Sequence, residues 1–199
     1  KGMTNDMSGQ TIGDPSAENL AASVSAATKG KGLPPIHLWN PPFCGDLDIR
    51  IARDGTWFYM GTPIGRPALV KLFSSILKCE DGKYFLVSPV EKVGITVEDA
   101  PFVAVDFDQI KGNLHFTTQV GDQMIAGPNH PIRVERNIQS GEPSPYVLVR
   151  TNLEALIDRK SFYRLVEIGV HETWEGKSWF GLCSQLTFFP IIPSADLDA

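Results

Sequence analysis

The stretch HLWNPPFCGDLDIRIARDGTWFYMGTPIGR, residues 37–66, contains the pattern that decides the fold of this chain. Between Asp46 and Arg53, apolar side chains alternate with charged ones, which is typical of a β-strand that buries one face. The next pair, Asp54-Gly55, favours a tight hairpin turn, and Thr56–Met60 can return as a second strand. The stretch therefore predicts a β-hairpin with one charged face.

Outward from this hairpin, the chain alternates helix-like and strand-like segments. A helix is predicted from about Arg66 to Lys78, because Pro67 suits a first helical turn and apolar residues recur at helical spacing. A second helix is predicted for Leu153 to Glu167, with Asn152 as its cap. The remaining predicted strands, separated by Gly, Asn and Asp turns, are Tyr84–Ser88, Val93–Val97, Phe102–Phe107, Leu114–Val120, Gln123–Ala126, Ile132–Glu135, Tyr146–Arg150 and an extended segment at Trp179–Phe189.

Composition divides the chain into three predicted parts. Residues 1–32 are rich in Ser, Ala, Gly and Thr, which predicts a flexible leader with a short helix that Asp14 caps and Pro15 begins. Residues 33–80 begin with a proline-stiffened arm and form a predicted N-terminal αβ domain. Residues 81–199 form a predicted C-terminal domain with a docked aromatic tail.

Two segments repeat the same order of elements. Thr56–Leu77 and Pro145–Val166 each read as an aromatic strand, a threonine-bearing turn and an amphipathic helix. The prediction is therefore an α+β fold of two related strand–helix domains. Because six or seven strands precede the final helix, the C-terminal domain has the outline of a pleckstrin-homology-like antiparallel barrel capped by a helix.

The overall composition excludes several classes of protein. The chain has 199 residues, of which 42% are hydrophobic and 21% charged, as in an ordinary soluble globular protein. A net charge of −5 disfavours a nucleic-acid partner. We expect no membrane span and no secretory signal, because no apolar run is long enough. The three cysteines and four histidines lack metal-ligand spacing, so we expect reduced thiols, a cytoplasmic location and no cofactor.

Candidate ligand-binding residues gather in the opening stretch. Arg50, Arg53 and Arg66 can hold a phosphate or carboxylate, since a planar guanidinium binds such anions through two hydrogen bonds. Arg66 also opens a helix, where backbone N–H groups favour an anion. The alternative is that these arginines pair with carboxylates at Asp46, Asp48, Asp54 or Glu91. The full predicted set is Trp39, Asn40, Asp46, Arg50, Arg53, Trp57, Arg66, Glu91 and Lys92.

The other members of this set also have structural alternatives. Trp39 and Trp57 can stack on a flat ring of a ligand, or pack in the core. Glu91-Lys92 can bind polar groups of a ligand, or form an exposed ion pair that contributes little. Cys44 with His37 is the one nucleophilic combination, but a buried structural cysteine is more common.

Three runs of the sequence are specific enough to suggest a family. WNPPFCGDLD at 39–48, DGTWFYMGTPIGR at 54–66 and SPVEK at 88–92 resemble the bacterial family of domain of unknown function 1285. The resemblance covers about Leu33 to Trp179. It implies two domains that arose by duplication, a C-terminal domain similar to pleckstrin-homology folds, a site for a nucleotide-like ligand at the domain interface, and a role in bacterial signalling. The family has no established activity.

The sequence therefore predicts a non-catalytic ligand-binding or signal-transduction module, with a small, anionic and nucleotide-like ligand at the domain interface. Two alternatives stay open. One is a cysteine-dependent enzyme or a redox sensor that uses Cys44. The other is an adaptor that binds a protein partner and no small ligand.

Overall fold

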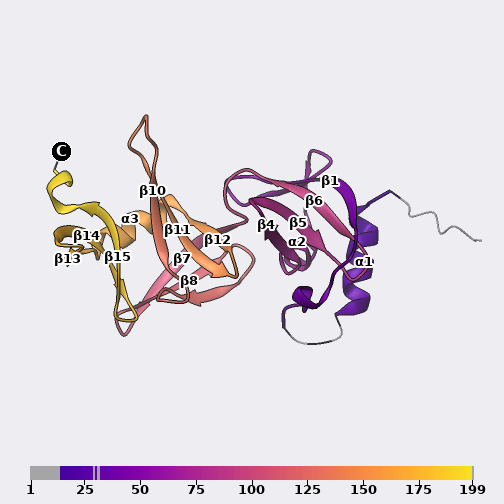
Figure 1. Cartoon of the computed structure of the whole chain (residues 1–199), viewed down its shortest axis with the longest axis horizontal. Helices are drawn as coiled ribbons and strands as arrows, with labels where there is room; N and C mark the ends of the chain where they lie inside the picture. Colours follow the sequence, from indigo (N-terminus) through magenta and orange to yellow (C-terminus); the bar gives the residue numbers. More distant parts are fainter. Residues whose placement is uncertain (1–13, 29, 31, 199) are drawn as a thin grey trace, which may run out of the picture.

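The computed structural model describes residues 14–28, 30 and 32–198. The part of the predicted leader at residues 1–13, 29 and 31 lies outside them. Within the described residues the protein is mostly β, with two sheet-rich units side by side along its long axis (Figure 1). The helices are α1 (Ala17–Ala27), α2 (Pro67–Ser74) and α3 (Arg159–Glu167), with short 3-10 turns η1 (Ile36–Leu38) and η2 (Ser194–Asp196).

The first unit is built on a six-stranded sheet in the order β3-β2-β1-β6-β5-β4. Its strands are β1 (Phe43–Ile51), β2 (Trp57–Tyr59), β3 (Thr62–Pro63), β4 (Leu77–Glu80), β5 (Lys83–Val87) and β6 (Lys92–Val97). Strands β1 and β6 are parallel and the other neighbours are antiparallel. The predicted hairpin is confirmed as β1–β2, and Asp54 Oδ1 accepts a hydrogen bond from the Thr56 backbone N–H (2.9 Å) in its turn.

The second unit is built on another six-stranded sheet, in the order β10-β11-β12-β7-β8-β9. Its strands are β7 (Phe102–Ile110), β8 (Asn113–Thr118), β9 (Gln123–Ile125), β10 (Ile132–Arg136), β11 (Pro143–Arg150) and β12 (Leu153–Ile157). Here β12 and β7 are the parallel pair. The predicted antiparallel arrangement is therefore wrong at this central pair. The sheet as a whole curls into a half-barrel (Figure 1).

The two sheets share one topology. Read from β4, the first sheet runs β4-β5-β6-β1-β2-β3, and the second runs β10-β11-β12-β7-β8-β9, so each strand has a counterpart six strands later. In both sheets the first and last strands of the unit form the central parallel pair. The predicted duplication is therefore confirmed. The two repeats meet between Val97 and Phe102 rather than at residue 80, because β5 and β6 complete the first sheet.

The repeated segments that suggested the duplication are not structural equivalents. In Thr56–Leu77 the helix α2 follows the third strand of its unit, whereas in Pro145–Val166 the helix α3 follows the sixth. The predicted helix at 153–167 is also wrong in its first part. Its burial alternates at Leu153–Ile157, which is the period of a strand, and Asp158 then caps α3 by accepting a hydrogen bond from the Ser161 N–H (2.8 Å).

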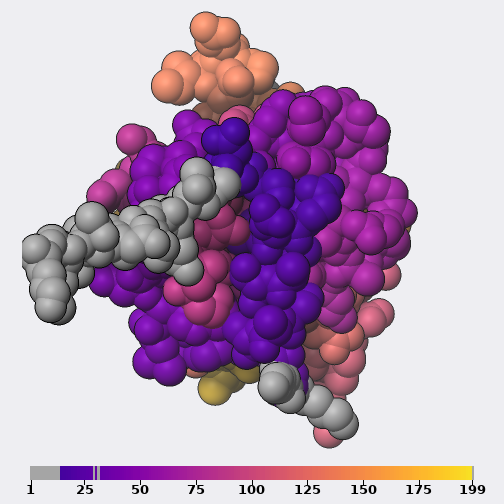
Figure 2. All heavy atoms as spheres, turned by 90° about the vertical axis from the view of Figure 1, so that its right-hand side faces the viewer, coloured from indigo at the N-terminus to yellow at the C-terminus, as the bar shows by residue number. Residues whose placement is uncertain are grey.

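The first predicted helix is shorter than expected as well. Helix α2 ends at Ser74, and Leu77–Glu80 pairs with β5 as strand β4. Ahead of the sheet, α1 buries Leu20 and Val24 against the first unit. Its cap is Ser16 rather than Asp14, since Ser16 Oγ accepts a hydrogen bond from the Asn19 N–H (3.1 Å). Figure 2 shows α1 on the end of the molecule that faces away from the second unit.

A third, antiparallel sheet of β13 (Val170–Trp174), β14 (Lys177–Ser184) and β15 (Thr187–Pro193) covers the second unit. The sequence indicated the extended segment that becomes β14 and β15 but missed β13. Ser184 joins the two layers, because its Oγ accepts a hydrogen bond from the Leu114 N–H (2.9 Å) and donates one to the Ala126 carbonyl (2.6 Å). The tail is thus part of the packed structure.

The hairpin turn of the first unit lies directly against the second unit. Gly55 is buried and has a φ of +90°, in the region that favours glycine. A Cβ at this position would lie 3.0 Å from Val103 Cγ2 and 3.2 Å from Gln119 Nε2. Only a residue without a side chain lets the two units approach this closely.

We predict that Gly55→Ala destabilises the protein more than Gly61→Ala does. Both glycines have positive φ, so each change costs about 1–2 kcal/mol in backbone strain. Gly61 has no atom within 4 Å of an added Cβ, whereas Gly55 adds the clash with the second unit. Urea unfolding of both variants measures the difference. Equal losses would contradict a close contact at Gly55.

Candidate functional site between the two sheets

The predicted arginines of the opening stretch do not converge on one site. Arg50 forms an ion pair with Glu98, and its guanidinium lies 4.2 Å from the centre of the Phe58 ring. Arg53 is also engaged. Its backbone N–H donates a hydrogen bond to Glu98 Oε2 (3.0 Å), and its Nη2 donates one to Ser144 Oγ (3.1 Å). Both guanidinium groups are therefore held by protein partners that are distant in sequence.

Asp99, in the segment between the two sheets, connects Arg53 to the second unit. Its Oδ2 lies 3.6 Å from Arg53 Nη1, and its Oδ1 accepts a hydrogen bond from the Tyr146 hydroxyl (2.7 Å). Burial raises the pKa of Tyr146 above its ordinary value, and the hydrogen bond to Asp99 raises it further. The network holds the linker between the repeats in place.

We predict that the stabilising effect of the Tyr146 hydroxyl is lost at alkaline pH. A raised pKa in the folded state means that this contribution is complete below the ordinary phenol pKa of about 10 and is lost as the pH rises above it. Tyr146→Phe should reduce the free energy of unfolding by about 1–2 kcal/mol at pH 7. Denaturant titrations of both proteins from pH 7 to 11 should show this difference shrinking above pH 10, and a constant difference would contradict the prediction.

Five other residues of the predicted set lie on or near the first sheet. Asp46 and Lys92 line a shared hollow of about 590 Å³, where Lys92 Nζ pairs with Glu80 Oε2 at 2.9 Å. Glu91 is half-buried in the turn before β6, and this burial raises the pKa of its carboxyl group. Trp39 is half-buried against the core and Asn40 is exposed beside it. The structure brings only Asp46 and Lys92 of this group together.

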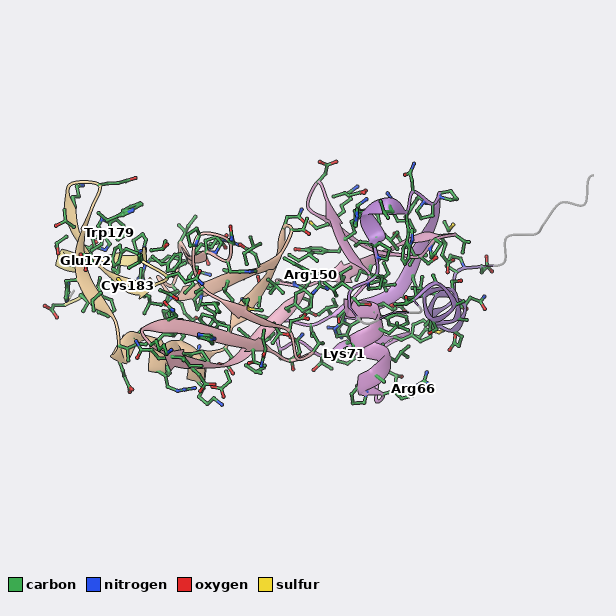
Figure 3. All side chains as sticks on the ribbon, turned by 90° about the horizontal axis from the view of Figure 1, so that it is seen from below. Arg66, Lys71, Arg150, Glu172, Trp179 and Cys183 are labelled. Atoms are coloured by element: carbon green, nitrogen blue, oxygen red, sulfur yellow. The ribbon has the colours of Figure 1, made fainter. Side chains whose placement is uncertain are left out.

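The cysteines give no support to a nucleophilic site. The Cys44 thiol donates to the Pro42 carbonyl at 3.4 Å, and no hydrogen bond joins it to His37 in the part of the chain that the structure describes. Burial, and then the nearby Glu172 carboxylate, raise the pKa of the Cys183 thiol, which disfavours its reactive form. Cys183 and Glu172 lie on the third sheet, at the far end of the molecule from Arg66 (Figure 3).

Arg150 links the two units at the end of α2. Its Nη2 donates to the Ser74 carbonyl (2.5 Å), and its Nη1 pairs with Asp122 Oδ2 at 3.1 Å. Asn152 adds a second link, because its Nδ2 donates to the Cys79 carbonyl (3.1 Å). Figure 3 shows Arg150 at the junction between the units. Arg150 thereby connects the β8–β9 turn, which contains Asp122, to the C-terminal end of α2.

We predict that Arg150→Met lowers the free energy of unfolding by about 2–4 kcal/mol, because it leaves Asp122 and the Ser74 carbonyl without their charged donor. Arg159→Met is the matched control. Arg159 pairs with Glu142 on an exposed surface, so its loss should change stability by less than about 1 kcal/mol. Urea unfolding at neutral pH compares the two variants. Similar, small losses would show that Arg150 does not hold the units together.

A cavity of about 380 Å³ lies between α2 and the β8–β9 turn. This volume is in the range of sites for small molecules. From the first unit it is lined by Gly55, Thr56, Trp57, Ile64, Gly65, Pro67, Ala68, Val70 and Lys71, and from the second by Gln119 and Val120. Trp57 is the one residue of the predicted set that lines it.

Two side chains of this cavity carry buried N–H groups that have no hydrogen-bond partner among the described residues. They are Trp57 Nε1 and Gln119 Nε2. The Gln119 amide is oriented by its other end, since Oε1 accepts a hydrogen bond from the Val103 N–H (2.8 Å). Trp57 is 2% exposed and stacks on Phe73 at 6.3 Å between ring centres. Both nitrogens are closed off from solvent, so they lie behind the surface of the cavity and not on it.

The start of α2 adds further donor capacity to the same wall. Arg66 is the N-cap residue of this helix, but its side chain makes no capping hydrogen bond. Pro67 has no N–H and the Leu69 N–H donates to the Arg66 carbonyl (3.1 Å), so among the described residues only Ala68 keeps a free N–H in the first turn, and the helix dipole favours negative charge beside it. Arg66 itself lines a separate hollow of about 240 Å³ between α1 and α2, so the structure does not place it in the interface cavity.

Sequence reasoning missed Gln119 and Lys71. Helical periodicity places Lys71 on the face of α2 opposite the buried Phe73, but it does not say that a second unit lies nearby. Gln119 falls inside the predicted strand Leu114–Val120, so the sequence reads it as an ordinary polar residue of a strand. Only the docking of the two units brings these side chains to one cavity.

Two wider searches of the described residues bear on the chemistry. No group of three or more His, Cys, Asp and Glu side chains is placed to hold a metal ion. None of the described helices combines the length and the apolar character needed to cross a membrane.

Comparison with known proteins identifies relatives for nearly the whole chain. Residues 34–100 match the family model described as "Domain of unknown function (DUF1285), N-terminal domain", and residues 101–191 match "Protein of unknown function (DUF1285), C-terminal domain". The crystal structure of a DUF1285 family protein from Silicibacter pomeroyi DSS-3 is similar with a TM-score of 0.79 and 59% sequence identity, over 90% of this chain and 98% of that one.

A second crystal structure, of a DUF1285 family protein from Shewanella baltica OS155, is 32% identical over 61% of this chain and 91% of that one, with a TM-score of 0.49. None of the curated proteins matches the chain.

Proposed function

Because the chain belongs to the DUF1285 family, whose two domains are both described as being of unknown function, we propose its role from the site itself: it is a non-catalytic module that binds a small anionic ligand between its two sheet units. The observation that carries this proposal is the interface cavity itself, whose lining contains the cationic side chain of Lys71 and no carboxylate.

The electrostatics of the cavity support an anion in particular. Lys71 lines it and has no ion-pair partner among the described residues, and the uncapped start of α2 favours negative charge. No aspartate or glutamate lines this cavity. An anion would therefore meet donors and a cation without a competing carboxylate.

The position of the cavity supports a role in signal transduction. Trp57 and Lys71 belong to the first unit and Gln119 to the second, so a bound ligand contacts both repeats at once. Occupancy would stabilise the arrangement in which the two units are docked. We place this event in the cytoplasm, where the free thiols of Cys44 and Cys79 stay reduced.

A thermal-unfolding screen tests the proposal with inorganic phosphate, AMP, cyclic AMP and small carboxylates as probes. A probe at a hundredfold its Kd should stabilise the protein by about 2.7 kcal/mol, which corresponds to an increase in Tm of about 5–10 °C. Trp57→Phe removes the indole N–H together with part of the buried ring in the wall of the cavity, so it should reduce this shift when the Tm of the variant with the probe is compared with its own Tm without it. Trp179→Phe, on the third sheet, is the matched control and should leave it unchanged.

Two results would contradict the proposal. One is that none of these anions raises the Tm of the wild-type protein. The other is that an anion raises it equally in the wild type and in Trp57→Phe, which would place the binding elsewhere.

A further inference from the structure

The charges around the interface cavity are few, and they limit what the ligand can carry. Lys71 is the single cationic side chain among the residues that line it, and the other polar donors, on Trp57 and Gln119, are neutral. Burying a charge without a counterion is costly. The cavity therefore balances one negative charge and not several.

The arginines that a phosphate group would need are engaged elsewhere. Arg50 pairs with Glu98, Arg53 contacts Ser144, and Arg150 pairs with Asp122. Phosphate recognition commonly relies on arginine, whose fork matches two phosphate oxygens at once. In this structure no guanidinium lines the interface cavity. A nucleoside diphosphate or triphosphate would bring charges that the wall does not neutralise.

The rest of the wall is mostly apolar. Apart from Thr56 and the glycines Gly55 and Gly65, it consists of Ile64, Pro67, Ala68, Val70 and Val120, together with the buried residue Trp57. Small-molecule sites commonly combine such a lining with a few placed polar groups that fix the orientation of the ligand. The lining therefore combines one cation with mostly apolar side chains, so the matching ligand has one anionic group and an apolar body.

We infer that the ligand of this cavity is a small monocarboxylate with an apolar body, and that Lys71 is the residue that recognises its charge. This inference rests on the proposed function and narrows its ligand class. The ammonium of Lys71 pairs with the carboxylate, and the apolar side chains of the lining contact the body of the ligand. A carboxylate needs no second cation, because it carries a single charge on two oxygens.

Isothermal titration with benzoate, benzamide, AMP and inorganic phosphate tests this class on the full chain. Benzoate and benzamide have nearly the same shape and differ in charge, so benzoate should bind at least about tenfold more tightly. Lys71→Met should weaken benzoate by about tenfold or more and leave benzamide unchanged. Lys160→Met, an exposed change on α3, is the matched control and should alter neither.

The outcomes separate this inference from the proposed function. If AMP or inorganic phosphate binds more tightly than benzoate, and Trp57→Phe weakens that binding, the ligand class is overturned while an interface site for an anion stands. If benzoate and benzamide bind equally, or if Lys71→Met has no effect on benzoate, the recognition of charge by Lys71 is overturned. If none of the four probes binds, both the inference and the proposed function fail. Lys71 is exposed, so its substitution should not prevent folding.

Discussion

The guanidinium of Arg150 is the interaction on which the joined structure depends. It donates to the Ser74 carbonyl at the end of α2, pairs with Asp122 and lies 5.0 Å from the centre of the Phe102 ring. A carbonyl at a helix end has lost its intrahelical donor, so a charged donor from the other unit satisfies it well. This contact fixes the β8–β9 turn along α2, and the interface cavity is the space left between them.

Duplication explains why the interface is a suitable place for a ligand. Each repeat is a six-stranded sheet with a central parallel pair, and neither repeat alone surrounds the cavity. Trp57 belongs to the second strand of its unit, whereas Gln119 follows the second strand of the other, so equivalent regions of the two repeats face each other. A small change in how the units dock would open or close the site, because interfaces switch between packed arrangements more readily than cores deform.

The buried donors distinguish this cavity from the other hollows of the surface. Arg50 and Lys92 have partners within the protein, whereas Trp57 Nε1 and Gln119 Nε2 have none among the described residues. Evolution can remove such donors with a single substitution, for example by phenylalanine in place of Trp57. Both lie behind the wall of this cavity, next to the start of α2.

The sequence by itself determined the β1–β2 hairpin, the existence of two related units and most of the strands, because period-two alternation and glycine turns are local signals. It also predicted a ligand-binding role for Trp57 and for Arg66 at the start of α2, and this role stays a prediction. The tertiary structure decided the boundary between the repeats, the strand at Leu153–Ile157 and the fate of each arginine, since sheet pairing and ion pairing join residues far apart in sequence. Gln119 and Lys71 line one cavity only because the two units dock. Docking between units produces no periodic pattern of residues in the sequence, so the sequence does not predict it.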